Sequence, residues 1–235
     1  MRLRRRDDPI LEILAGTGRQ MADAALPTVA FVAVWLVAQA LAWPEPILLG
    51  GLAAVVVAGV ISVVRWRGGE RPRAAAVGLL VAVVATLIAL YTGRAEDFFL
   101  PRIIANAGSL AAWLVSIAIR WPLLGLVVSA ALGRPRAWRN DPDLVRGYCR
   151  ASWLWAAQYL VRIVVMLPLW ATDHVVALGI AQVVLTWPLV LVCALGSWPL
   201  VRSVLPPGHP GPRHPVDGGF VPGEQGVDAE APGPA

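Results

Sequence analysis

Apolar residues dominate the chain from about position 24 to position 201, in long stretches that short polar segments interrupt. A helix needs about 20 apolar residues to cross a hydrocarbon core of roughly 30 Å, and six stretches are near that length. A seventh, of about 12 residues, is too short to cross and predicts a re-entrant or interfacial half-helix. The six predicted spans cover residues 24–43, 47–64, 74–91, 98–119, 152–170 and 175–201, and the half-helix covers residues 121–132.

This pattern predicts an all-α fold, a polytopic transmembrane helix bundle with about six spanning helices and the additional half-helix. The transmembrane domain would occupy residues 24–202. A basic cytoplasmic lead-in, residues 1–23, precedes it. Residues 203–235 are dominated by Pro, Gly and acidic residues, which bury too little apolar surface to fold. They are expected to form a disordered cytoplasmic tail.

The arginines predict the orientation of the spans. All 20 basic residues are Arg, and with both termini in the cytoplasm, 17 of them lie on the cytoplasmic side. Arg94 alone lies outside, while Arg102 and Arg162 fall within spans. Because cytoplasmic loops carry the excess of basic residues, this asymmetry favours cytoplasmic termini and a multi-pass protein of the cell (inner) membrane. If residues 121–132 crossed fully, the Arg-rich segment 133–150 would move outside, so the same rule favours the half-helix.

Composition narrows the classes of protein further. The chain is 57% hydrophobic and 15% charged, with a mean hydropathy of +0.65, which is typical of a membrane protein and not of a soluble domain. The net charge of +5 does not indicate nucleic-acid binding, since the basic residues flank apolar runs and form no single face. The expected partners are therefore the bilayer and anionic lipids at the cytoplasmic face. Cys149 and Cys193 have no metal-ligand or disulfide spacing, so neither a metal nor a cofactor is expected.

Arg162 is the most informative polar residue, because it lies near the middle of the fifth predicted span with Gln158 one helical turn away. An ionisable side chain at membrane depth is a functional candidate by default. A functional Arg162 would bind an anionic substrate or a lipid headgroup. A structural Arg162 would form an interhelical ion pair, or would donate to backbone carbonyls near a proline kink.

A second polar group surrounds the start of the fourth predicted span. Glu96 and Asp97 precede Pro101, and Arg102 and Asn106 share one helix face. One interpretation is a capped helix start with local ion pairs. The other is an external vestibule in which one of the two acids pairs with Arg102 or with Arg162. Four residues of the basic inner loop are candidate membrane-surface anchors before a predicted helix start at Pro142: Arg134, Arg136, Trp138 and Arg139.

Several segments resemble an actinobacterial family of integral membrane proteins of unknown function. They are residues 92–101 (TGRAEDFFLP), 106–108, 120–123 (RWPL), 137–139 and 153–162. The likeness covers about residues 23–202 and implies family membership without implying an activity. More distantly, the short hydrophobic hairpins resemble the intracellular septation protein A group, which would imply a role in envelope or division assembly.

The sequence carries no nucleotide-binding, metalloprotease or nucleophile-elbow motif, and no cluster of His or carboxylates within the spans, so an enzyme is not expected. The leading hypothesis is a non-enzymatic envelope or assembly protein that acts through protein or lipid partners. The alternative is a small transporter or channel with a polar path around Arg162, Glu96, Asp97 and Arg102. The sequence leaves open whether the protein forms a homo-oligomer.

Overall fold

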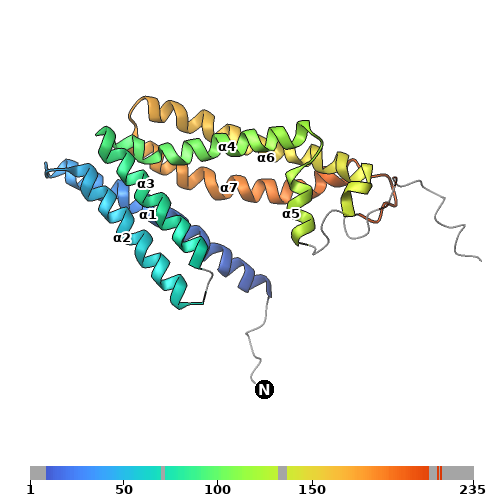
Figure 1. Cartoon of the computed structure of the whole chain (residues 1–235), viewed down its shortest axis with the longest axis horizontal. Coiled ribbons are helices and arrows are strands. Elements are labelled where there is room, and N and C mark those ends of the chain that lie inside the picture. The colour runs from blue at the N-terminus through green and yellow to red at the C-terminus, as the bar shows by residue number, and fades with distance from the viewer. Residues whose placement is uncertain (1–8, 70–71, 132–136, 212–215, 217, 219–235) are drawn as a thin grey trace, which may run out of the picture. The chain divides into compact units, whose positions relative to one another are not determined.

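A computed structural model of the 235-residue chain describes residues 9–69, 72–131, 137–211, 216 and 218. In this part of the chain the regular structure is entirely helical, as the sequence predicts (Figure 1). The elements are α1 (Pro9–Ala40), α2 (Pro46–Arg67), α3 (Pro72–Thr92), the 3₁₀ helix η1 (Ala95–Phe99), α4 (Leu100–Ala118), α5 (Leu123–Ala131), the 3₁₀ helix η2 (Ala137–Asn140), α6 (Pro142–Ala171) and α7 (Val175–Arg202).

Four helical segments of this part are long and apolar enough to cross a membrane. They are Pro46–Arg67, Ala95–Ala118, Pro142–Ala171 and Val175–Arg202. The apolar portions of α1 and α3, Ala25–Ala40 and Ala76–Thr92, are shorter. Six spans, and the cytoplasmic placement of both termini, therefore stay predictions.

The chain divides into two compact units. Unit 1 comprises residues 1–105 and 162–187, and unit 2 comprises residues 106–161 and 188–235. The helices α4, α6 and α7 are each continuous across this division, so each contributes residues to both units.

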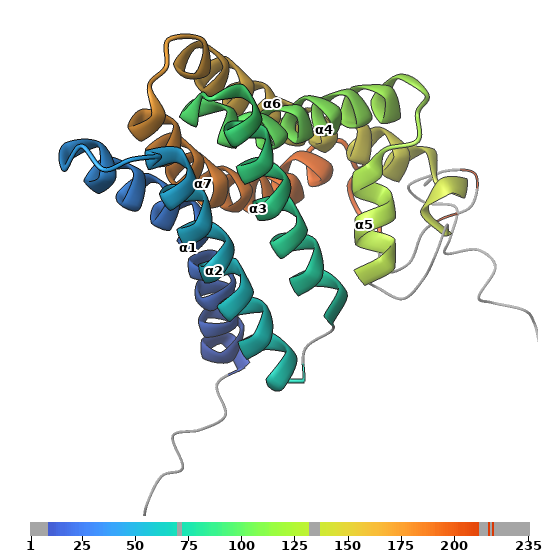
Figure 2. The same cartoon turned by 60° about the vertical axis from the view of Figure 1, so that its left-hand side comes forward.

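In unit 1, α2 packs against both α1 and α3 (Figure 2). Glycine is needed on α2, because a Cβ on Gly51 would lie only 2.2 Å from the Thr86 methyl carbon. The core of the unit is aromatic. Phe98 of η1 stacks on Phe31 of α1 with ring centroids 3.9 Å apart, and Phe99 packs edge-on against both rings. These contacts fix η1, and with it the first turn of α4, against α1.

Unit 2 contains α5, η2 and the start of α6. After α4 ends, Arg120 takes a left-handed conformation (φ 52°), and the nine-residue α5 begins at Leu123. The core includes Trp113, Leu144 and Tyr148. Helix α6 begins at Pro142, as predicted, but ten residues before the predicted span. Asp141 accepts hydrogen bonds from the backbone N–H groups of Asp143 and Leu144, both at 3.1 Å, so it is the N-cap of α6.

The segment that follows α7 makes specific hydrogen bonds within unit 2. His209 and the backbone N–H of Val216 both bond the Asp141 carboxylate, and the N–H of Gly218 donates to the carbonyl of Asn140. The predicted disordered tail begins at residue 203, so the described residues 203–211, 216 and 218 differ from that expectation. The other residues of the predicted tail lie outside the described part of the chain.

Candidate functional site: a polar pocket in unit 1

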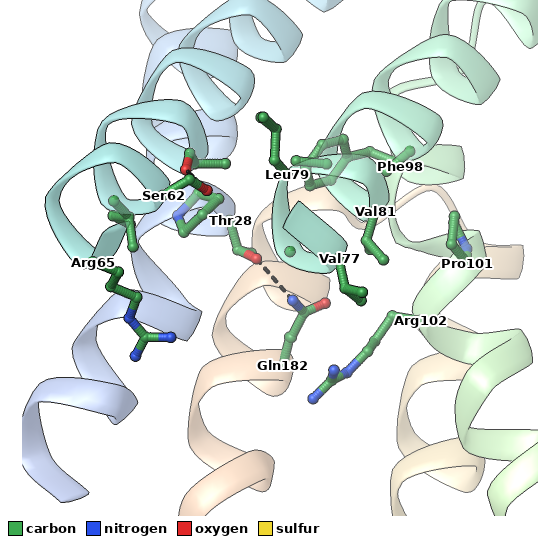
Figure 3. A pocket seen from close by; sticks show the side chains of 16 residues that line it. Thr28, Ser62, Arg65, Val77, Leu79, Val81, Phe98, Pro101, Arg102 and Gln182 are labelled. Atoms are coloured by element: carbon green, nitrogen blue, oxygen red, sulfur yellow. Dashed lines mark hydrogen bonds between the residues drawn. The ribbon is translucent and has the colours of Figure 1, made fainter. Parts of the chain in front are cut away.

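A cavity of about 400 Å³ lies in unit 1 between the C-terminal half of α2 and the N-terminal half of α3 (Figure 3). Its walls are mainly apolar, including Val77, Ala82 and Phe98. Polar side chains reach it from four helices: Thr28, Ser62, Arg65, Arg102 and Gln182. Figure 3 shows Arg65 and Arg102 on opposite sides of the pocket, with Gln182 between them.

The fold brings these polar groups together from positions far apart in the sequence. Arg65 lies in the last turn of α2 and Arg102 in the first turn of α4, directly after the buried Phe98 and Phe99. Gln182 of α7 is held in place by its amide, which donates to the Thr28 hydroxyl at 2.7 Å. The pocket is therefore built from separate helices that the aromatic core and this hydrogen bond position.

The arrangement can bind an anion. A guanidinium presents its N–H donors in a planar fork that matches the oxygen atoms of phosphate and carboxylate. Two such forks on opposite sides of one pocket, with neutral hydroxyl and amide groups nearby, are the donor types that contact an anionic group. The apolar walls lower the local dielectric and strengthen this attraction. From the sequence, Arg65 was predicted only as one of the cytoplasmic arginines, and Arg102 as part of an outer polar cluster.

Arg162 lies close to this region but is differently engaged. Its side chain is buried, and its Nη2 donates to the carbonyl of Thr186 at 2.9 Å. Thr186 lies two residues before Pro188, so this bond is the one that the structural interpretation of Arg162 predicts. A second cavity, of about 50 Å³, is lined by Thr186 together with Arg102 and Gln182. Arg162 therefore anchors a helix that forms part of the wall.

Glu96 and Asp97 belong to a separate network that joins two loops. Arg94 forms an ion pair with Glu96, and its Nη2 lies 2.7 Å from Oδ1 of Asp173. The indole N–H of Trp170 donates to Asp97 at 2.7 Å, and the Arg94 guanidinium lies over the Trp170 ring. The hydrogen bond from Arg94 lowers the pKa of Asp173 below its ordinary value, and the same contact raises the pKa of Arg94. Sequence analysis missed Arg94 and Asp173 as the partners that join these loops.

The remaining candidates lie elsewhere. Asn106 and Gln158 are buried, but they belong to unit 2. Arg134 and Arg136 lie outside the described residues. Trp138, expected as a headgroup-level anchor, is buried against Tyr148, with ring centroids 5.5 Å apart. Gly125 of α5 makes this possible, because a Cβ there would lie 2.7 Å from the Trp138 ring.

Arg139, the fourth candidate anchor, is exposed. Its guanidinium carbon lies 3.5 Å from the centroid of the Trp121 ring. This contact is a cation–π interaction between η2 and the turn before α5. A membrane-surface role for Arg139 stays a prediction.

The side chains of Asp141, Asp143 and His209 in unit 2 have the donor types of a metal site, with ligand atoms within 4.8 Å of one another. Their hydrogen bonds oppose that interpretation. The N–H of Gly211 donates to Nδ1 of His209 at 2.9 Å, so the ring proton lies on Nε2, which contacts Asp141 at 3.0 Å. A metal on Nε2 would require a proton on Nδ1, facing the Gly211 donor. The cluster is therefore better explained as a set of hydrogen bonds that holds the segment after α7 against Asp141 than as a metal centre. We call this set the Asp141 clamp.

Comparison with known proteins gives a family but no activity. Residues 15–207 match the model of a family described as a protein of unknown function (DUF3159). This match supports the resemblance to an uncharacterised family, and it carries no information on an actinobacterial source or on septation proteins. No curated protein and no solved structure matches the chain.

Proposed function

The chain belongs to this family of proteins of unknown function, and we propose that it is a non-enzymatic, multi-pass membrane protein that binds an anionic partner in the pocket of unit 1. The proposal includes six spans, cytoplasmic termini and residence in the cell (inner) membrane. Its role would be in envelope organisation or assembly, exercised through the bound partner.

The observation that carries the proposal is the pair of guanidinium groups, Arg65 and Arg102, lining one cavity with mainly apolar walls. Arg65 is half-buried and Arg102 is exposed, so both can contact a ligand that enters the pocket. An arginine at membrane depth is costly to hold, and it is a candidate functional residue by default. An anionic ligand in the pocket would contact both guanidiniums in addition to the interactions that they make within the protein.

The predicted topology favours lipid as the source of the anion. Arg65 ends α2 on the side assigned to the cytoplasm, and the cytoplasmic leaflet carries the anionic lipids. An arginine near that surface contributes about 1 kcal/mol to the attraction. The same topology places Arg102, at the start of α4, toward the outer side, so the shared pocket, and not the topology, is what supports selection of an anionic headgroup by both arginines.

The contacts of the carboxylates support a non-enzymatic role. A general acid or base must be able to reach the substrate proton that it transfers. Glu96 is paired with Arg94, and Asp97 accepts from the Trp170 indole. The transporter alternative gains no support from the described contacts, because Arg162 is buried against the carbonyl of Thr186.

The test measures lipid binding by the purified 235-residue protein. Native mass spectrometry compares how much phosphatidylglycerol and phosphatidylcholine, with identical acyl chains, the protein retains. We expect preferential retention of phosphatidylglycerol. Arg65→Gln and Arg102→Gln should each weaken it about fivefold, the equivalent of about 1 kcal/mol. The matched control is Arg150→Gln, which removes an exposed arginine of α6 that does not line the pocket. Equal retention of the two lipids, or equal losses in all three variants, would refute the proposal.

A further inference from the structure

A second hollow of unit 1 adjoins the polar pocket. It is a groove of about 380 Å³ between α1 and α7. The helices approach closely at its floor, where a Cβ on Gly179 would lie 2.8 Å from a methyl carbon of Val32. Apart from Thr28, the side chains that line the groove are apolar, among them Val29, Leu36, Ile180 and Val184. Such a surface fits hydrocarbon and offers almost nothing to a soluble anion.

The groove and the pocket share one lining residue. Thr28 lines both hollows, and its hydroxyl accepts the amide N–H of Gln182, which lines the pocket. On α7, Gln182 lies directly beside Val183, which lines the groove. The lining therefore changes from cationic and polar to apolar across the Thr28–Gln182 pair.

We propose that the ligand is an anionic phospholipid that occupies both hollows, with its phosphate near Arg65 and Arg102 and one acyl chain in the α1–α7 groove. This inference rests on the proposed function and specifies its ligand. The lining residue that the two hollows share, Thr28, and the charge of the pocket favour one amphiphile over two separate occupants. A free phosphate would contact the arginines and leave the groove to ordinary bilayer lipid. A zwitterionic lipid would fill the groove without a preference for the pocket.

Acyl-chain burial gives little affinity in a bilayer, because the chain leaves one apolar environment for another. The measurement must therefore report where the chain lies. The probes are phosphatidylglycerol and phosphatidylcholine that carry a photoactivatable diazirine on the same acyl chain. After reconstitution of the full chain and illumination, peptide mass spectrometry locates the cross-links. We expect phosphatidylglycerol to label residues 29–36 and 176–184 more strongly than phosphatidylcholine does.

Two variants test the headgroup site and the acyl-chain groove separately. Arg102→Gln should reduce the groove labelling by phosphatidylglycerol about fivefold, because the headgroup is no longer held. Val184→Trp fills the groove at a position that is 56% exposed, and it should abolish groove labelling while retention of phosphatidylglycerol in native mass spectrometry persists. The matched control is Val56→Trp, a 61% exposed site on α2 outside both hollows, and should change neither readout.

Equal groove labelling by the two lipids would overturn this inference and leave the anion pocket intact, provided that phosphatidylglycerol is still preferentially retained. Inorganic phosphate that protects the protein from unfolding through Arg102, without any groove preference, would identify a soluble anion as the ligand and would also overturn it. Equal retention of the two lipids in native mass spectrometry would instead contradict the proposed function, on which this inference depends.

Discussion

Unit 1 and unit 2 place charged side chains in different surroundings. In unit 2 the Asp141 carboxylate is fully buried, and its two oxygens accept four hydrogen bonds from the same unit. In unit 1 the guanidiniums of Arg65 and Arg102 line a cavity of about 400 Å³. A carboxylate whose lone pairs are all used can hold a fold together but has little left for a ligand.

The contacts of a charged side chain distinguish a structural residue from a candidate binding residue better than its burial alone does. Arg162 shows why, because it is as buried as the residues of the Asp141 cluster and yet lies in the unit that contains the pocket. Its bond to the Thr186 carbonyl is a contact of the kind that the structural interpretation describes, and its role stays a prediction. The comparison predicts that charge removal in unit 2 costs stability, whereas charge removal around the pocket of unit 1 changes accessibility and binding.

The largest expected effect is that of Asp141→Ala. The substitution removes the N-cap of α6, which costs about 1 kcal/mol, and it leaves buried N–H donors unsatisfied at about 1–3 kcal/mol each. We expect a loss of about 3 kcal/mol in the free energy of unfolding, measured by denaturant titration in detergent and followed by tryptophan fluorescence. Limited proteolysis should also cleave the segment after Val201 faster. Asn140→Ala, at an exposed neighbouring position, is the control and should change stability by less than about 0.5 kcal/mol. Equal stability of the two variants would contradict the claim that the hydrogen bonds of Asp141 stabilise unit 2.

A second prediction concerns water access in unit 1. In a protein that lacks Cys149 and Cys193, a membrane-impermeant maleimide should label Arg102→Cys readily. It should label Arg162→Cys at least about tenfold more slowly, because that site must first open locally. Val77→Cys, which lines the pocket, and Met166→Cys, buried one turn after Arg162, repeat the contrast without removing an arginine. Rapid labelling at both 162 and 166 would indicate a water-filled path and would restore the transporter hypothesis.

The helices were predictable from the sequence, because long apolar runs between charged or proline-containing segments leave few alternatives in a chain of this composition. The start of α6 was predictable for a local reason, since Pro142 suits the first turn of a helix. The shorter apolar portions of α1 and α3 show the limit of this approach, because length and composition alone do not establish that they cross a membrane.

The pocket was not predictable in the same way. Arg65 and Arg102 lie 37 positions apart in the sequence, and they line one pocket only in the folded chain, where η1 packs against Phe31 of α1 just before α4. The Asp141 clamp was not predictable, because the Pro- and Gly-rich composition of the segment after α7 is typical of a disordered tail. His209 and Gly211 of that segment nevertheless make specific hydrogen bonds. Sequence patterns gave the elements, while the partners of the charged side chains depended on tertiary contacts.

A smaller effect is expected for the contact between Arg139 and Trp121 in unit 2. Arg139→Gln should cost about 0.5–1 kcal/mol of unfolding free energy, the usual contribution of a cation–π contact at an exposed site. A double-mutant cycle with Trp121→Leu isolates the pair, and Arg150→Gln controls for the loss of one exposed charge. If the cycle gives no coupling energy, Arg139 is available for the membrane-surface role that the sequence suggests.

The smallest expected effect is the pH dependence of the loop network in unit 1. The hydrogen bond from Arg94 lowers the pKa of Asp173, so the stability that this carboxylate contributes is present above its ordinary pKa of about 3.9 and is lost as the pH falls through the lowered value. The raised pKa of Arg94 keeps that partner charged throughout this window. The thermal midpoint of the wild type should therefore exceed that of Asp173→Asn near pH 6, and the difference should shrink below about pH 4 and in high salt.

Because Asp173 is exposed, solvent screens this pair, and the effect should be smaller than that of any substitution at the Asp141 clamp. Glu45→Gln, an exposed carboxylate in the turn before α2, is the control for the loss of a loop charge. A difference between wild type and Asp173→Asn that persists unchanged at low pH would mean that Asp173 acts through its shape or backbone and not through its charge. A large, salt-independent effect would mean that the loops of unit 1 are held by a buried ion pair. The contrast between the fully hydrogen-bonded Asp141 of unit 2 and the arginines that line the cavity of unit 1 would then apply to the pocket alone.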